Sequence, residues 1–152
     1  MDIYVDADAC PVKDEALRVA ERHSLVVHMV SNSYMRLADS PLIRRVVVAD
    51  GPDAADDWIV ERLAAGDIVV TADIPLAARA VKKGAQALAP NGRAFSEASI
   101  GMTLAVRDLM ANLRETGDVK SHNPAFTRRD RSQFLQTLED IIQALKRSAR
   151  SS

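Results

Sequence analysis

Short β-branched runs alternate along the chain with longer segments whose apolar residues have helical spacing. The runs predict strands at residues 3–5, 25–30, 46–48, 68–70 and 85–88. Between them, helical spacing predicts helices from Pro11 toward His23, over residues 53–65 before Gly66, and from Pro75 to Gly84. Strands joined by helix-length connections pair in parallel through right-handed crossovers. We therefore predict an α/β three-layer sandwich with a mainly parallel central sheet of about five strands.

Two apolar stripes predict helices in the C-terminal part of the chain. The stripes follow i, i+4, i+7 spacing, as expected for amphipathic helices that pack on a core. They consist of Met102, Val106, Leu109, Met110 and Leu113, and of Phe134, Leu138, Ile141, Ile142 and Leu145. Residues 118–131 read as a polar connection and residues 148–152 as a flexible tail. Residues 1–147 are thus predicted to form one domain.

Composition excludes several classes of protein. Cys10 is the only cysteine, so neither a disulfide scaffold within one chain nor a cysteine-based zinc site is expected. No apolar run approaches the roughly 18–20 residues that span a bilayer, and no signal peptide is visible, so we expect a cytoplasmic protein. Aromatic residues make up only 4%, which argues against a base-stacking platform.

The two halves of the chain carry opposite charge. Residues 1–73 contain 7 Lys/Arg and 14 Asp/Glu, a net charge of −7, whereas residues 74–152 contain 13 and 7, a net of +6. An acidic site beside an anion-binding surface would produce such a split, although it also arises by chance.

Acidic residues follow two of the predicted strands directly. Asp6 and Asp8 come after the first strand, and Asp73, preceded by Thr71, comes after the fourth. Ligands of such sheets bind beyond the carboxyl ends of the strands, and the fourth strand is commonly the neighbour of the first. The converging carboxylates predict a site for Mg²⁺ or Mn²⁺, which prefer oxygen ligands.

Other acids have a competing explanation. An aspartate at a helix N-terminus can simply cap the helix, and Asp8 and Asp53 could each have that role alone. Asp53, Asp56 and Asp57 open the helix before the fourth strand, and we expect them to start at the opposite edge of the sheet unless the helix tilts inward.

The motifs themselves are recognisable. Residues 5–11 (VDADACP), 51–56 (GPDAAD), 66–77 (GDIVVTADIPLA), 84–85 and 90–92 resemble the uncharacterised YaiI/YqxD family over nearly the whole chain. More distantly, Asp6, Asp56 and Asp73 look like the acidic motifs of PIN-like nucleases. That resemblance implies a PIN-like fold and a Mg²⁺ or Mn²⁺ ion held by Asp6, Asp56 and Asp73, with Asp53 in support. Asn91 stands where the fourth acid of those nucleases would be, which disfavours a two-ion mechanism.

The leading hypothesis is therefore a metal-dependent nuclease that acts on RNA in preference to DNA. Asp6, Asp8 and Asp73 are its candidate catalytic residues, and Ser31, Asn32, Thr71 and Lys13 are candidates for substrate contact. Two alternatives remain open. Asp6-x-Asp8 also resembles the nucleophile and acid of haloacid-dehalogenase phosphatases, with Ser31 as a phosphate ligand. The chain could instead be a non-catalytic module that binds RNA or protein, and a homo-oligomer is compatible with all three.

Overall fold

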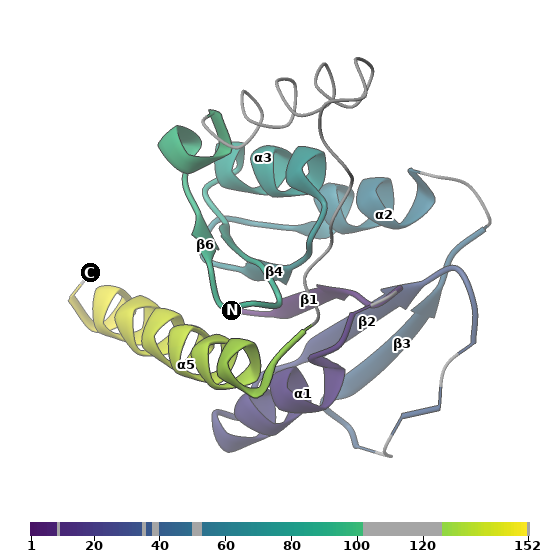
Figure 1. The fold of residues 1–152 in the computed structure, drawn as a ribbon, viewed down its shortest axis with the longest axis horizontal. Helices are drawn as coiled ribbons and strands as arrows, with labels where there is room; N and C mark the ends of the chain where they lie inside the picture. Colours follow the sequence, from purple (N-terminus) through teal and green to yellow (C-terminus); the bar gives the residue numbers. More distant parts are fainter. Residues whose placement is uncertain (9, 35, 38–39, 50–52, 102–125, 152) are drawn as a thin grey trace.

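The computed structural model describes residues 1–8, 10–34, 36–37, 40–49, 53–101 and 126–151. Six strands form one sheet in the order β3-β2-β1-β4-β5-β6 (Figure 1). The strands are β1 (Ile3–Asp6), β2 (Val27–Ser31), β3 (Ile43–Val47), β4 (Ile68–Val70), β5 (Gln86–Leu88) and β6 (Ala94–Phe95). β3, β2, β1, β4 and β5 pair in parallel, and β6 pairs antiparallel with β5. The predicted α/β class and the parallel sheet are confirmed.

Strand β1 lies at the centre, between β2 and β4. Its register aligns Val5 with Val70 of β4 and Asp6 with Val30 of β2. From β1 the chain adds β2 and β3 on one side and then β4 and β5 on the other, so the strand order reverses between β1 and β4. Sheets of this kind bind ligands at such a switch point. The predicted contact between the first and fourth strands is therefore confirmed.

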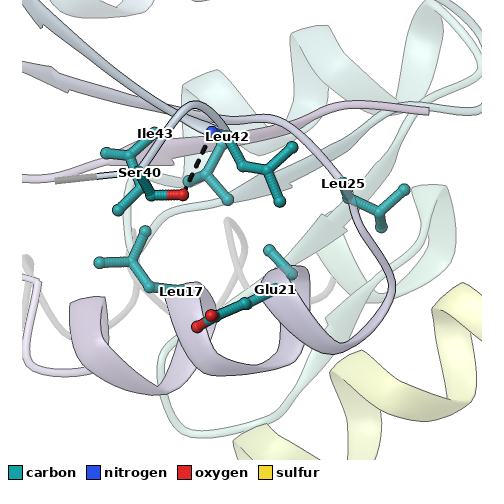
Figure 2. A pocket seen from close by; sticks show the side chains of 8 residues that line it. Leu17, Glu21, Leu25, Ser40, Leu42 and Ile43 are labelled. Atoms are coloured by element: carbon teal, nitrogen blue, oxygen red, sulfur yellow. Dashed lines mark hydrogen bonds between the residues drawn. The ribbon is translucent and has the colours of Figure 1, made fainter. Parts of the chain in front are cut away.

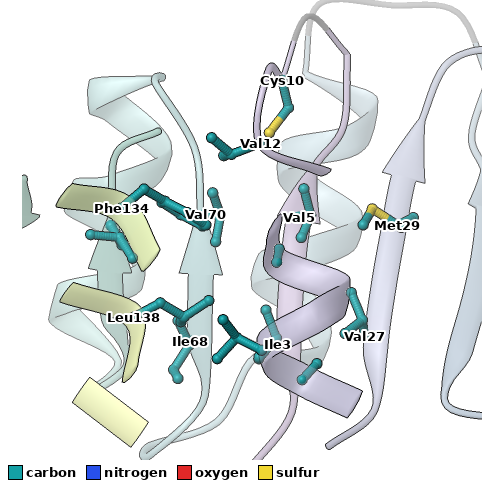
Figure 3. Close-up of a cluster of buried hydrophobic side chains, with 14 of the residues drawn as sticks. Ile3, Val5, Cys10, Val12, Val27, Met29, Ile68, Val70, Phe134 and Leu138 are labelled. Atoms are coloured by element: carbon teal, nitrogen blue, oxygen red, sulfur yellow. The ribbon is translucent and has the colours of Figure 1, made fainter. Parts of the chain in front are cut away.

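Helices cover both faces of the sheet (Figure 1). On one face, α1 (Lys13–Arg22) and α5 (Arg128–Ser151) pack on Ile3, Val5 and Val70, with Phe134 and Leu138 of α5 turned toward β4 (Figure 3). On the other face, α2 (Ala54–Arg62) and α3 (Ile74–Lys82) pack on a second cluster that includes Tyr4. Because side chains of a strand alternate between faces, Asp6 follows Tyr4 toward α2 and α3.

Several boundaries differ from the prediction. The third strand begins at Ile43, earlier than expected, because Arg44 and Arg45 are exposed strand residues that break the apolar run. The apolar stripe from Phe134 to Leu145 does form a helix, but α5 extends to Ser151, into the segment predicted as a tail. The predicted stripe from Met102 to Leu113 lies outside the described residues. Among the described residues, none of the helices combines the length and the hydropathy of a membrane-spanning segment.

The expected position of the α2 N-terminus was wrong. β3 ends at Val47 at the carboxyl edge of the sheet, and the chain enters α2 at Ala54 directly after this connection. The helix that follows a parallel strand therefore starts at the carboxyl edge and runs back toward the amino edge. No inward tilt is needed for its acidic first turn to face the ends of β1 and β4.

Candidate functional site

Asp6 is held by a hydroxyl from the neighbouring strand. Thr71, which is 1% exposed and follows β4, donates a hydrogen bond from Oγ1 to Asp6 Oδ2 over 3.0 Å. Asp6 Oδ1 accepts no hydrogen bond from the described part of the chain. Burial raises the pKa of Asp6, the Thr71 hydrogen bond opposes this shift, and the charges of Asp73 and Asp8 add to it. The Oδ1 atom of Asp6 is thus available to a ligand, and the raised pKa makes this carboxyl group harder to ionise.

Asp73 is set by the same threonine and by helix α3. Its backbone N–H donates to Thr71 Oγ1 over 2.9 Å, and its Oδ1 accepts from the backbone N–H of Leu76 over 2.9 Å. Asp73 is therefore the N-cap of α3, with Pro75 in the first turn. The cap uses only one carboxylate oxygen, so the capping and ligand-binding interpretations of Asp73 are compatible.

Asp56 completes the acidic group from the first turn of α2. Its side chain forms no hydrogen bond or ion pair with the described residues, although it is only 9% exposed. Burial raises its pKa to about 6, and the negative charges of Asp73, Asp6 and Asp53 contribute, against a small opposing effect of Arg79. The charges of Asp6, Asp56 and Asp73 thus act on one another within one region, which we call the acidic site.

Asp8 belongs to the other side of β1. Ser31 Oγ donates to Asp8 Oδ1 over 2.7 Å, and the backbone N–H of Asn32 donates to Asp8 Oδ2 over 3.1 Å. Ser31 is 1% exposed, and its hydroxyl also accepts from the Ser33 N–H over 3.1 Å. Both oxygens of Asp8 are therefore engaged in tying the end of β1 to the end of β2.

The remaining predicted residues are distributed around this core. Asp53 occupies the N-cap position of α2 without a side-chain cap, and it acts on Asp56 through its charge. Asp57 is instead exposed and pairs with Arg79 of α3 over 2.9 Å. Lys13 is the first residue of α1, and its charge reaches Cys10, whose thiol pKa is raised by burial. Asn91 Oδ1 accepts from the Arg93 N–H in the turn before β6.

The acidic site is not a closed metal cage. Within the described ranges, no three His, Cys, Asp or Glu side chains are arranged to hold one metal ion together. The donors are nevertheless hard oxygens, and Mg²⁺ commonly takes one or two direct carboxylates and completes its octahedron with water. Two direct ligands, with a third carboxylate acting through water, match that coordination better than three direct ones.

A separate pocket lies beside the first residues of β2 and β3, at the end of the sheet opposite the acidic site (Figure 2). It has a volume of about 160 Å³ and is lined mainly by aliphatic side chains of α1 and of the starts of β2 and β3, among them Leu17, Val27 and Ile43. Because those strands start where the acidic site is farthest away, this pocket takes no part in the site. Its lining offers a single carboxylate, Glu21, and so no constellation for catalysis.

Comparisons with known proteins agree on one family. The model described as "Uncharacterized BCR, YaiI/YqxD family" matches residues 4–144. A UPF0178 protein of Parvibaculum lavamentivorans is 64% identical over 146 residues, covering 96% of each chain. UPF0178 proteins of Rhodospirillum rubrum and Rhizobium meliloti are 56% and 59% identical, covering 97% and 95% of this chain and 99% of each relative. No solved structure matches the chain.

Proposed function

Because the chain belongs to the YaiI/YqxD (UPF0178) family, whose description states no activity, we propose a function from the acidic site itself. The proposal is a Mg²⁺- or Mn²⁺-dependent hydrolase of phosphodiesters, with RNA preferred over DNA as the resemblance to PIN-like nucleases implies. One observation carries it. Asp56 is buried beside Asp6 and Asp73 at the switch point, and this burial, together with the negative charges of Asp73 and Asp6, raises the pKa of Asp56 to about 6.

The donor set fits a hard divalent cation. Asp6 Oδ1 and Asp73 Oδ2 are the oxygens that the Thr71 and Leu76 hydrogen bonds leave available for direct coordination. Asp56 would act through water, with Asp53 adding negative charge behind it. When bound, such an ion polarises a phosphoryl oxygen and lowers the pKa of a coordinated water.

The chain's own residues supply positioning and charge. Thr71 fixes Asp6 and the backbone of Asp73 at once, so the two direct ligands keep their spacing. Because the pKa of Asp56 is about 6, its carboxyl group could accept a proton from an attacking water and release it again near neutral pH. Ser31 and Asn32 shape the adjacent β2 end, and Lys13 stands at the start of α1 as a candidate phosphate contact.

The phosphatase alternative has less support. In it Asp8 would have to protonate a leaving group, yet both Asp8 oxygens accept hydrogen bonds from Ser31 and Asn32. Ser31, the candidate phosphate ligand, is 1% exposed and already donates its only hydroxyl proton to Asp8.

The decisive experiment combines metal titration with RNA cleavage. Asp6→Asn and Asp73→Asn preserve the shape of each side chain, so we expect folded proteins that lose calorimetric Mn²⁺ binding and at least about 100-fold of cleavage, since even outer-sphere partners of a metal contribute 10–100-fold. Asp57→Asn is the matched control, because Asp57 lies one residue from Asp56 but pairs with Arg79. Full cleavage by both Asp6→Asn and Asp73→Asn would refute the proposal. Absence of Mn²⁺ binding by the wild-type protein at millimolar metal would favour the non-catalytic alternative.

A further inference from the structure

A histidine at the end of α1 connects α1 to α5 through both of its ring nitrogens. His23 is the C-cap of α1, and its side chain is only 8% exposed. Its Nε2 lies 2.9 Å from Glu139 Oε1 and 2.8 Å from Glu139 Oε2, and its Nδ1 lies 2.8 Å from Lys146 Nζ. Glu139 and Lys146 are about two helical turns apart, so they lie on the same side of α5. The imidazole therefore stands between a carboxylate and an ammonium group.

The two partners decide which ring nitrogen of His23 carries the proton. An ammonium group can donate but not accept, so Lys146 Nζ donates and His23 Nδ1 accepts with its lone pair. The neutral imidazole then carries its proton on Nε2, which donates to Glu139. Lys146, His23 and Glu139 thus form a chain of hydrogen bonds that all run in one direction, which we call the His23 relay.

Protonation of His23 breaks one end of the relay and strengthens the other. An imidazolium carries a proton on both nitrogens, so its Nδ1–H would point at the Lys146 ammonium group, which has the same charge and no acceptor. At Nε2 the hydrogen bond to Glu139 becomes an ion pair, and Arg22 of α1 binds the same carboxylate over 3.0 Å. Lys146 is partly exposed and can turn to water, so its contact is the one that is lost.

The relay acts on the last turns of α5. The apolar stripe that packs this helix on the core ends at Leu145, and the residues that follow are mostly polar or charged. The helix nevertheless continues to Ser151. Because most helical stability in proteins comes from packing rather than from propensity, a helix end beyond its apolar stripe depends on other tertiary contacts. The hydrogen bond from Lys146 to His23 is such a contact with α1.

We propose that the His23 relay is a pH-dependent latch, which holds the end of α5 on α1 when His23 is neutral and releases it when His23 is protonated. Histidine is the side chain whose charge ordinarily changes between pH 5 and 8. Acidification then loosens residues 146–151, whereas Phe134 and Leu138 keep the body of α5 in the core. The latch is separate from the acidic site, because α1 starts at the carboxyl edge of the sheet and His23 lies at its other end.

The first test determines the tautomer of His23. The full chain, labelled with ¹⁵N-histidine, is examined by ¹⁵N–¹H NMR at pH 8, and His23→Asn identifies the His23 signals among those of the three histidines. We expect the neutral ring to carry its proton on Nε2 and to accept at Nδ1. A ring that carries its proton mainly on Nδ1 would overturn the latch, since Lys146 could not donate to it.

The second test measures the release itself by hydrogen–deuterium exchange at pH 8 and pH 5, corrected for the intrinsic rates. Hydrogen bonds from His23 and Gln143 lower the pKa of Glu139, so its carboxylate stays charged at both pH values. We expect the amides of residues 146–151 to lose about 5-fold of protection or more at pH 5, as for the loss of one hydrogen bond, while those around Leu138 keep theirs. Equal protection of residues 146–151 at the two pH values would overturn the latch.

Lys146→Met serves as the variant that removes only the donor. It keeps a long apolar side chain without the ammonium group, so residues 146–151 should show the low protection at pH 8 as well as at pH 5. Because Lys146 is partly exposed, the variant is expected to fold, which urea unfolding at pH 8 checks. Protection like that of the wild-type protein in folded Lys146→Met would show that the relay does not hold the helix end.

Two variants of His23 separate the ends of the relay. His23→Asn places a carbonyl oxygen near the position of Nδ1, so it can accept from Lys146 but cannot titrate. His23→Gln places an amide NH₂ near the position of Nε2, so it can donate to Glu139 only. We expect residues 146–151 to be protected equally at both pH values in His23→Asn and to be weakly protected at both in His23→Gln. A loss of protection at pH 5 that persists in both variants would assign the pH dependence to another group and overturn the latch.

Discussion

Thr71 Oγ1 donates a hydrogen bond of 3.0 Å to Asp6 Oδ2. The buried hydroxyl group that follows β4 thus fixes the carboxylate at the end of β1. Ser31 repeats the arrangement on the other side of β1, where its hydroxyl donates to Asp8 over 2.7 Å. The central strand thus ends between two hydroxyls, each fixing one of its two acids. In the proposed site, Asp6 keeps one oxygen for a metal ion, whereas both oxygens of Asp8 accept hydrogen bonds from Ser31 and Asn32.

The first prediction concerns Thr71→Val, which keeps the side-chain shape and removes the hydroxyl. The hydrogen bond lowers the pKa of Asp6 against the effect of burial, so its loss should raise that pKa further and disfavour the ionised form. We expect Mn²⁺ affinity to fall by about 10-fold, as for other outer-sphere partners, and the free energy of unfolding to fall by about 1–2 kcal/mol. Calorimetric titration and urea unfolding measure the two effects.

Two variants control for simple loss of packing. Thr71→Ser restores the hydroxyl and should recover most of the metal affinity. Ser31→Ala removes an equally buried hydroxyl that serves Asp8, so it should reduce stability without a comparable loss of Mn²⁺ affinity. Equal metal affinities in Thr71→Val and Ser31→Ala would contradict the assigned role of Thr71.

The second prediction concerns the pH dependence contributed by Asp56. Its folded pKa of about 6 lies above the ordinary value of 3.8, so protonation is favoured in the folded state. Its contribution to stability is therefore fully present below pH 3.8 and is lost as the pH rises through about 6. In metal-free protein, Asp56→Asn should raise Tm at pH 7.5 by about 2–4 °C, corresponding to roughly 1 kcal/mol in a domain of this size.

At pH 4 the same substitution should leave Tm nearly unchanged, because Asp56 is already largely protonated there. Asp57→Asn provides the comparison, since that carboxylate is exposed and paired with Arg79. Differential scanning calorimetry at both pH values, in EDTA, makes the measurement. A stabilisation by Asp56→Asn of the same size at pH 4 and pH 7.5 would show that its charge is not the cause.

The inner strands of the sheet were largely predictable because β1, β2 and β4 are mostly buried. Residues 68–70 were assigned as a strand with the bounds that the structure gives β4, whose three residues are all buried. The same criterion missed β6, since Ala94–Phe95 is too short to show alternation and is not fully buried. Periodicity thus detects core strands and is weak at the edges, where Arg44 and Arg45 face solvent.

The acidic site was predictable only in part. Asp6 and Asp73 could be paired from strand order alone, because each follows a strand and both strands meet at the switch point. The position of Asp56 was misjudged by placing the start of α2 at the wrong edge, although chain direction alone would have corrected it.

The third prediction concerns the ionic contact between α1 and α5. Glu139 accepts from His23 Nε2 over 2.8 Å and pairs with Arg22 over 3.0 Å, and the hydrogen bonds from His23 and Gln143 lower its pKa. Glu139→Gln should reduce stability at neutral pH by about 1 kcal/mol or less, because the pair is partly exposed. Since the folded pKa is depressed, this difference should shrink as the pH falls through that pKa. Asp140→Asn, on the exposed side of α5, should have no such effect, and urea unfolding at two pH values tests both.

The last prediction concerns Gly92, where the turn before β6 meets α5. Its φ is +90°, and a Cβ added there would lie 2.6 Å from the backbone carbon of Gln133, closer than real contacts allow. We expect Gly92→Ala to lower the free energy of unfolding by about 2–4 kcal/mol, combining backbone strain with the clash. Gly66→Ala is the matched control, because Gly66 has a similar φ of +87° but nothing within 4 Å of an added Cβ. Gly66→Ala should therefore show only the strain, about 1–2 kcal/mol, and equal losses in the two variants would show that the approach of α5 to this turn is looser than the structure indicates.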